Sequence, residues 1–177
     1  MREWKSEVWW RNRPVDERVK NLHIPKRIQG SMAPNAVDFE ENLFIQGTSG
    51  SGKSALAART LYNIVTNNKV SGRWVEADDY IEMIKDTFDD GGELPEMYSS
   101  PHLVKYIKAS FDVIVLDGLG EERLTEFATH ELGSLIRKRF EKEKATIITS
   151  RLSLQDIKHR YGARLATPLA EFDFRAV

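Results

Sequence analysis

A short loop rich in glycine and serine carries the clearest chemistry in this sequence. Its residues are Gly47, Thr48, Ser49, Gly50, Ser51, Gly52, Lys53 and Ser54. They fit the pattern G-x-x-x-x-G-K-[ST], in which glycines allow left-handed turns and successive amide N–H groups surround an anion. The lysine of this pattern reaches the β- and γ-phosphates of a nucleoside triphosphate, and the hydroxyl after it is a ligand for Mg²⁺. The loop and the following Ala55 are therefore predicted to bind ATP or ADP, with Lys53 also acting in catalysis and Ser54 binding the metal.

A carboxylate at the end of an apolar run completes the predicted metal site. Asp117 follows the uninterrupted apolar residues 113–116, which are typical of a central parallel strand. Open α/β sheets bind ligands at the carboxyl ends of their strands, so Asp117 is predicted to hold Mg²⁺ together with Ser54. Thr149 ends a second strand-like run, and we expect it beside Asp117. There its hydroxyl either contacts the γ-phosphate or the attacking water, or simply caps the strand.

Hydrolysis also needs a side chain that orients or deprotonates the attacking water. In many ATPases of this kind an acid directly after the strand-end aspartate does this, but that position is Gly118 here. Glu121 and Glu122 follow within reach on a glycine-rich turn. Glu121 is the candidate catalytic base, with Glu122 as its substitute. The alternative is that both glutamates only supply negative charge at a helix N-terminus.

These side chains need a parallel sheet to bring them together, and the sequence predicts one. Apolar runs alternate with segments of helical periodicity, which indicates parallel strands joined by right-handed crossovers. The expected strands are 42–46, 73–77, 111–117, 145–149 and, at an edge, 172–176. The expected helices are 55–67, one capped by Asp78 that ends near 88, one opening at Pro101, 125–142, and one capped by Ser153 that ends near 159. The predicted fold class is therefore α/β, a P-loop NTPase with a parallel five-stranded sheet and helices on both faces.

Composition indicates a globular chain with two parts. Its 177 residues are 41% hydrophobic and 30% charged and include no cysteine, which excludes disulfides and cysteine-based zinc sites. The absence of an 18-residue apolar run and of an apolar signal core predicts a cytoplasmic protein with no membrane partner. Residues 1–22 are expected to form a basic, tryptophan-rich arm, and residues 23–177 the ATPase core.

Charge is unevenly distributed along the chain although the net charge is −1. Residues 76–96 hold nine acids and one base, whereas residues 137–164 hold nine bases and three acids. One interpretation is that both are ordinary solvated helix faces. The other is that copies assemble head to tail through them, or that the basic stretch binds nucleic acid.

Several segments match the pattern of one protein family. They are residues 24–27, the phosphate loop with 55–58, residues 80–88, and the runs 113–120, 146–150 and 160–165. Through them, residues 22–174 resemble the AAA+ core of DnaC-like replicative helicase loaders and, more distantly, the IstB-like ATPases of transposition. The resemblance implies a RecA-like AAA+ core with little or no C-terminal lid.

The resemblance also implies partners. In that family, ATP-bound cores stack into a spiral, grip single-stranded DNA and deliver it to a hexameric helicase. The implied partners are therefore a replicative hexameric helicase, single-stranded DNA and further copies of this chain, arranged head to tail. Lys85 and Phe88 are implied to bind DNA, the lysine at phosphates and the ring by base stacking. For Phe88 the alternative is a core contact at the end of its helix.

Three positions depart from the family pattern and bear on hydrolysis. Gly118 replaces an acid, Arg151 replaces the usual asparagine, and Pro168 replaces a late arginine thought to act across the subunit interface. Arg164 is the nearest arginine that could act instead, with Arg160 as the alternative. Because such an arginine raises the rate by about 10³–10⁵, slow ATP hydrolysis is expected.

Three functions therefore stay open. The leading hypothesis is an ATP-binding helicase loader that acts in DNA replication. A transposition-type, IstB-like ATPase would use the same core and prefer duplex DNA, and a regulatory nucleotide-binding adaptor would bind ATP without efficient hydrolysis. Trp9 and Trp10 of the N-terminal arm are interpreted as a helicase-docking segment, or else they pack on the chain's own core.

Overall fold

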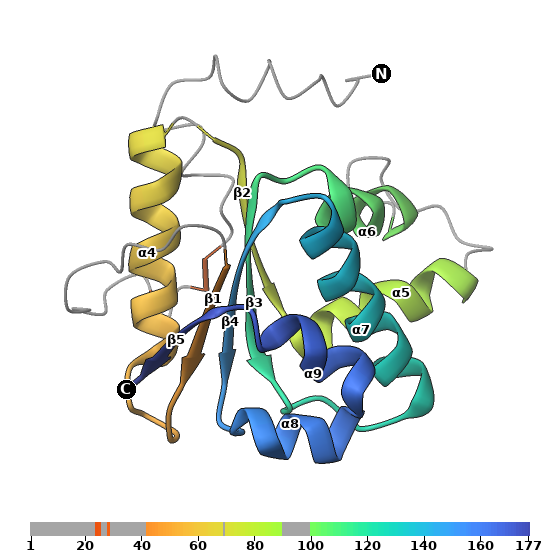
Figure 1. The fold of residues 1–177 in the computed structure, drawn as a ribbon. Helices are drawn as coiled ribbons and strands as arrows, with labels where there is room; N and C mark the ends of the chain where they lie inside the picture. Colours follow the sequence, from red (N-terminus) through yellow and green to blue (C-terminus); the bar gives the residue numbers. More distant parts are fainter. Residues whose placement is uncertain (1–23, 26–27, 29–41, 69, 90–99) are drawn as a thin grey trace, which may run out of the picture.

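The computed structural model describes residues 24–25, 28, 42–68, 70–89 and 100–177 of the chain (Figure 1). The predicted N-terminal arm, residues 1–22, lies outside the described residues. The same holds for Lys26 and Arg27 of the 24–27 segment.

Five strands form one parallel sheet, as the alternation of apolar runs and helices predicted. The strand order is β2-β3-β4-β1-β5, and every neighbouring pair is parallel, so the carboxyl ends of all strands lie at one edge. β3 continues two residues beyond its predicted end, and its register with β4 shifts between Leu116 and Leu119. The bounds are β1 (Asn42–Gln46), β2 (Gly72–Glu76), β3 (Val113–Leu119), β4 (Ala145–Ser150) and β5 (Asp173–Ala176).

Helices cover both faces of the sheet, which confirms the predicted α/β fold class. The helix after the phosphate loop, α4 (Lys53–Asn68), packs on one face, on the left in Figure 1, and the helices that follow gather on the other face. Those helices are α5 (Ala77–Asp89), α6 (Ser100–Ala109), α7 (Glu126–Glu141), α8 (Leu154–Tyr161) and α9 (Ala163–Leu169). None of the helices in the described ranges is both long enough and apolar enough to span a bilayer.

The central strand β3 is buried on both faces, which is why its sequence is a continuous apolar run. Side chains alternate along a strand, so neighbouring residues face opposite sides of the sheet. Val113 and Val115 pack in the core under α4, and Ile114 and Leu116 pack in the core under the helices on the other face. Asp117, the next residue, is thus carried to the edge of the sheet by a strand fixed from both sides.

One predicted helix cap was wrong, one helix was missed, and one predicted cap was confirmed. α5 begins at Ala77, so Asp78 lies inside the first turn rather than at the N-cap, where its charge still favours the helix dipole. α9 was not predicted from the sequence, and Pro168 lies within it. Ser153 caps α8 as predicted, in a reciprocal capping box with Asp156.

A buried arginine ties the helices to the amino ends of the central strands. Arg139 of α7 is 0% exposed. Its guanidinium donates to the carbonyl oxygens of Ile107, Phe111 and Ala145 at 2.8–3.1 Å, and its Nε donates to the Thr146 hydroxyl at 3.0 Å. Burial lowers the pKa of Arg139 to about 9, and the nearby Asp112 carboxylate partly opposes this. One side chain therefore joins α6, α7, β4 and the segment just before β3.

Candidate functional site

The phosphate loop connects β1 to α4 and is folded around the helix N-terminus. Gly52, directly before the helix, has a φ of +95°, which an L side chain rarely adopts. Lys53, the first residue of α4, is buried, and its Nζ donates to the Thr48 carbonyl across the loop at 3.1 Å. α4 is 16 residues long, so its dipole favours an anion at this end.

Three predicted site residues from three elements meet at one carboxylate oxygen. Asp117 of β3 is only 6% exposed. The hydroxyl of Ser54, from α4, donates to its Oδ1 at 2.8 Å, and the hydroxyl of Thr149, from β4, donates to the same oxygen at 2.6 Å. The Thr149 oxygen in turn accepts from the Gly118 backbone N–H at 3.0 Å. Thr149 therefore holds Asp117 in place and joins the ends of two neighbouring strands.

A tight turn after Asp117 folds Glu121 back towards position 118. Gly118 has a φ of +78°, and its carbonyl accepts from the Glu121 N–H at 2.9 Å. A Cβ added at Gly118 would lie 3.5 Å from Cδ and Oε2 of Glu121. The Glu121 carboxylate is thus close to the place where an acid at position 118 would begin. The sequence predicted only that Glu121 lies within reach of the attacking water, because the shape of this turn is not evident from the residues alone.

The two candidate bases have different surroundings. Glu121 is about half exposed, and its Oε1 lies 3.0 Å from Nε of Arg151, which is also half exposed. Glu122 is 2% exposed, accepts from the Gly120 N–H at 2.9 Å, and accepts a short hydrogen bond from the Tyr161 hydroxyl. Burial raises the pKa of Tyr161, and the bond to Glu122 raises it further. Glu122 therefore anchors α8 to the turn, and of the two only Glu121 has a carboxylate open to solvent.

Comparison with known proteins identifies the family. The family model described as IstB-like ATP binding protein matches residues 20–171. The chain belongs to the IstB-like ATP-binding protein family. As a member of it, the chain is an ATP-binding protein with a DnaC/IstB-like AAA+ ATPase core. None of the curated protein sequences matches it.

Three solved structures share the fold of this IstB-like core. The DnaC helicase loader is 27% identical, with a TM-score of 0.67 over 77% of this chain and 78% of that chain. DnaI is 19% identical, with a TM-score of 0.65 over 92% and 80% of the two chains. Replication initiator DnaA bound to AMPPCP and single-stranded DNA is 20% identical, with a TM-score of 0.64 over 92% of this chain and 44% of that chain.

The arginines expected to replace the family's late arginine have different environments in this IstB-like core. Arg160 donates to the Glu122 carbonyl at 2.9 Å and lies 3.9 Å from its carboxylate, so it is engaged within the chain. Arg164 is exposed on α9, and a Cβ added at Gly133 of α7 would lie 3.9 Å from its Cγ. Arg164 is therefore the more accessible of the two.

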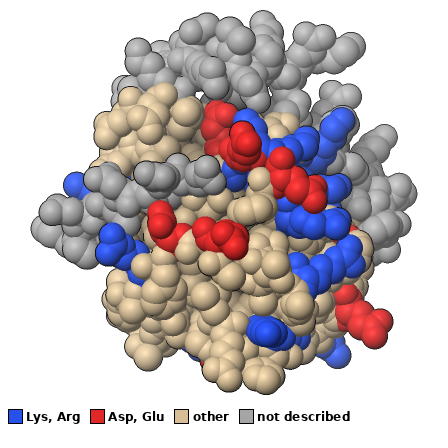
Figure 2. Space-filling model, in the orientation of Figure 1, with Lys and Arg blue, Asp and Glu red and all other residues tan. Residues whose placement is uncertain are grey.

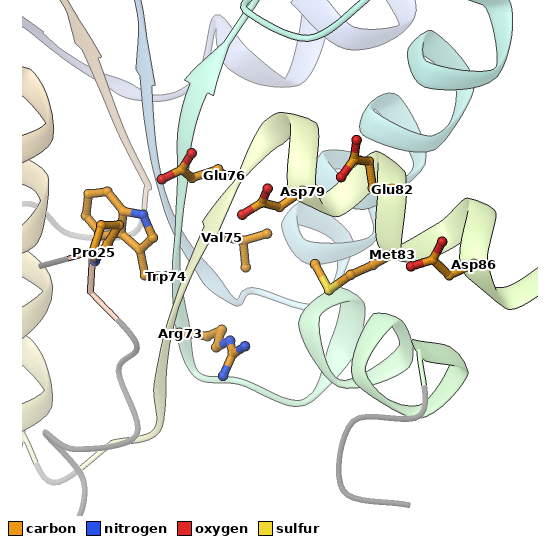
Figure 3. Close-up of a pocket in the computed structure, with 9 residues that line it drawn as sticks. All are labelled: Pro25, Arg73, Trp74, Val75, Glu76, Asp79, Glu82, Met83 and Asp86. Carbon is orange, nitrogen blue, oxygen red and sulfur yellow. The ribbon is translucent and has the colours of Figure 1, made fainter. Parts of the chain in front are cut away.

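The predicted DNA-binding residues lie on α5, whose surroundings are acidic. Lys85 is exposed, and the side chain of Phe88 lies outside the described residues. Glu76 at the end of β2 and three carboxylates of α5 line a pocket of about 360 Å³ (Figure 3). The α5 carboxylates are those of Asp79, Glu82 and Asp86. Their spacing places them on one helix face, so a phosphate group that approaches Lys85 also meets like charge.

Proposed function

We propose that this IstB-like protein is an AAA+ helicase loader that acts in DNA replication. It binds ATP, holds single-stranded DNA and delivers a replicative hexameric helicase. The observation that carries the proposal is the contact of Ser54 and Thr149 with Asp117 beside the phosphate loop. A nucleotide bound at the loop would meet the sheet at this edge. The similarity to the DnaC helicase loader, at 27% identity, supports the assignment as a loader.

The side chains at this edge suit Mg²⁺, which prefers hydroxyl, carboxylate and phosphate oxygens. Ser54 Oγ and Asp117 Oδ1 are 2.8 Å apart and are the two protein groups that would hold the ion. When bound, it neutralises charge on the β- and γ-phosphates. Mg²⁺ usually binds through one or two protein groups and keeps several waters, so water and the nucleotide phosphates would supply its remaining ligands. Lys53, which donates to the Thr48 carbonyl here, would donate to a phosphate oxygen of the bound nucleotide.

Hydrolysis uses Glu121 as the base and is slow. The Glu121 carboxylate takes the role of the acid that related ATPases have at position 118, because the turn brings it close to Gly118. An ion pair between half-exposed groups contributes only about 0–1 kcal/mol, so Arg151 does not prevent Glu121 from contacting a water. Arg164 of a neighbouring copy, stacked head to tail, supplies positive charge at the γ-phosphate. An isolated chain has no neighbouring copy to supply this arginine, which limits its turnover.

DNA and the helicase contact other parts of the chain. A structure of DnaA with the same fold is bound to AMPPCP and single-stranded DNA, which supports single-stranded DNA as the ligand here. Lys85 and Phe88 remain the proposed contacts on α5. The tryptophan-rich arm, residues 1–22, serves as the helicase-docking segment, since tryptophan and arginine dominate binding hot spots.

A co-purification experiment tests the proposal. The full chain is mixed with the replicative hexameric helicase of its own host, with ATP and Mg²⁺, and the mixture is separated by size. We expect the helicase to co-elute with the wild-type chain and not with Lys53→Ala, and Trp9→Ala/Trp10→Ala to weaken the complex. Independent elution of both proteins in every nucleotide state would contradict the proposal.

A second candidate function has a specific observation in its favour. The family model that matches residues 20–171 is named for IstB-like proteins, so a transposition-type ATPase with the same core is the alternative. Gly118 and Pro168 also fit a regulatory adaptor that binds ATP without efficient hydrolysis. Preference for duplex over single-stranded DNA would favour the transposition ATPase, and ATP binding without DNA-stimulated turnover would favour the adaptor.

A further inference from the structure

Lysines gather on a surface that the proposed function has not used. A groove of about 530 Å³ lies between α6 and α7, and its charged lining is mainly Lys105, Lys108, Lys138 and Lys142. The remaining lining residues are Val104, Ala109 and Glu141. Figure 2 shows basic side chains gathered on the right of the molecule, where α6 and α7 lie in Figure 1. We call this feature the lysine groove.

Most of this positive charge is not neutralised within the described part of the chain. Lys108 pairs with Glu131 at 2.7 Å. Lys105, Lys138 and Lys142 are exposed, and no described carboxylate lies within ion-pair distance of them. The acid in the lining, Glu141, lies 3.8 Å from Nε of Arg137. The groove therefore presents a net positive surface to a ligand.

Helix stabilisation explains only part of the pattern. Lys108 and Lys138 lie in the last turns of α6 and α7, where positive charge stabilises the helix dipole. Lys105 lies one turn earlier in α6 and gains less from this effect, which falls off within the last turn. Helix stabilisation therefore accounts less well for Lys105 than for Lys108 and Lys138.

The chemistry of the groove favours a phosphate backbone over an acidic peptide. All four cations are lysines, whereas the planar fork of arginine is the group suited to bidentate carboxylate pairing. Lysine is a point charge on a flexible stem, and it neutralises successive phosphates without fixed geometry. Lys105 and Lys108 lie three residues apart on α6, and Lys138 of α7 lies four residues before Lys142, the C-cap of that helix. The four lysines therefore form two rows along the groove. Packed helices have axes about 8–10 Å apart, which suits one extended strand better than a duplex.

We propose that the lysine groove binds the phosphate backbone of single-stranded DNA without sequence preference. This inference rests on the proposed function, because it presumes a chain that handles DNA. It adds phosphate contacts on α6 and α7 to the contacts proposed on the acidic α5. Val104 and Ala109 supply apolar contact beside the lysines.

The test is fluorescence anisotropy of a labelled oligothymidylate with the full chain and ATP, at about 50–200 mM salt. Lys105→Gln/Lys142→Gln removes two exposed charges from the groove, and Lys158→Gln, exposed on α8, is the matched control. We expect the double variant to bind about tenfold more weakly at the lowest salt. Its plot of log affinity against log salt should be shallower by about 1.4, since each contact with a single strand contributes about 0.7. The control should match the wild type.

The outcomes separate this inference from the proposed function. Wild-type binding with an unchanged double variant overturns the lysine groove and leaves the proposed function standing. ATP binding without any affinity of the wild type for single-stranded DNA overturns both. If the wild type binds duplex DNA more tightly than single-stranded DNA, and the double variant loses that duplex binding, the assignment to a single strand is overturned. Thermal unfolding of both variants is measured alongside, because a purely helix-stabilising lysine would change the melting temperature and leave DNA affinity unaltered.

Discussion

Thr149→Val removes one hydroxyl from the centre of the candidate site and keeps the size of the side chain. This hydroxyl is fully buried, donates to Asp117 Oδ1 at 2.6 Å and accepts from the Gly118 N–H at 3.0 Å. A hydrogen bond to a charged group contributes about 1.5–3 kcal/mol, and a buried N–H without a partner costs about 1–3 kcal/mol. Ser54 still donates to the same carboxylate, and the two energy contributions do not simply add because they involve residues in contact. We therefore expect the free energy of unfolding to fall by about 3–4 kcal/mol.

Urea denaturation followed by circular dichroism measures this loss, and Thr149→Ser is the matched control. The serine variant keeps the hydroxyl and loses one methyl group, which costs about 1 kcal/mol. The valine variant should also melt roughly 6–16 °C below the wild type, at about 2–4 °C for each kcal/mol in a chain of this length. Valine and serine variants that unfold within about 0.5 kcal/mol of each other would refute the reasoning, because the hydroxyl would then not hold the two strand ends together.

Three further outcomes are expected. Glu121→Gln should slow ATP turnover by about 100-fold or more while ATP affinity in calorimetry stays unchanged; unaltered turnover would reject Glu121 as the base. Arg139→Met should lower the free energy of unfolding in urea by about 3–5 kcal/mol, because four buried acceptors lose their donor, whereas Arg137→Met on the exposed face should have little effect. Burial alone would raise the pKa of Asp112, but hydrogen bonds from Ser71 and Lys144 outweigh it and lower that pKa. The folded pKa of Asp112 is then below the unfolded one, so this stabilisation is present above about pH 4 and is lost as pH falls through the folded pKa. Urea denaturation across that range should show a decline in the free energy of unfolding, and Lys144→Met should make this decline smaller.

Local patterns were sufficient to predict most of the fold. The apolar runs that became β1, β3 and β4 carry their own signal, since a buried parallel strand is apolar on both faces. The phosphate loop between β1 and α4 is fixed by glycine chemistry within eight residues. The closeness of Ser54 and Asp117 follows from the positions of the phosphate loop and β3, because the carboxyl ends of parallel strands share one edge of the sheet.

Features that depend on contacts between distant segments were not predictable. Glu122 resembles any acid after a strand, yet it is buried because Tyr161, 39 residues later, donates to it. Arg139 was counted among the bases of 137–164, whereas it is buried because carbonyl groups from three separate segments converge on it. α9 was missed altogether; it packs against α7 and accommodates Pro168 near its last turn.

Calorimetry of nucleotide binding tests the central claim most directly. ATP with Mg²⁺ is titrated into the full chain, into Lys53→Ala, and into Asp117→Asn with and without Mg²⁺, after circular dichroism has shown that each variant is folded. We expect the wild type to bind, Lys53→Ala to bind about 10–100-fold more weakly, and Asp117→Asn to lose affinity only when Mg²⁺ is present. Equal affinities for the wild type and Lys53→Ala, or no heat of binding in the wild type, would contradict ATP binding at this loop.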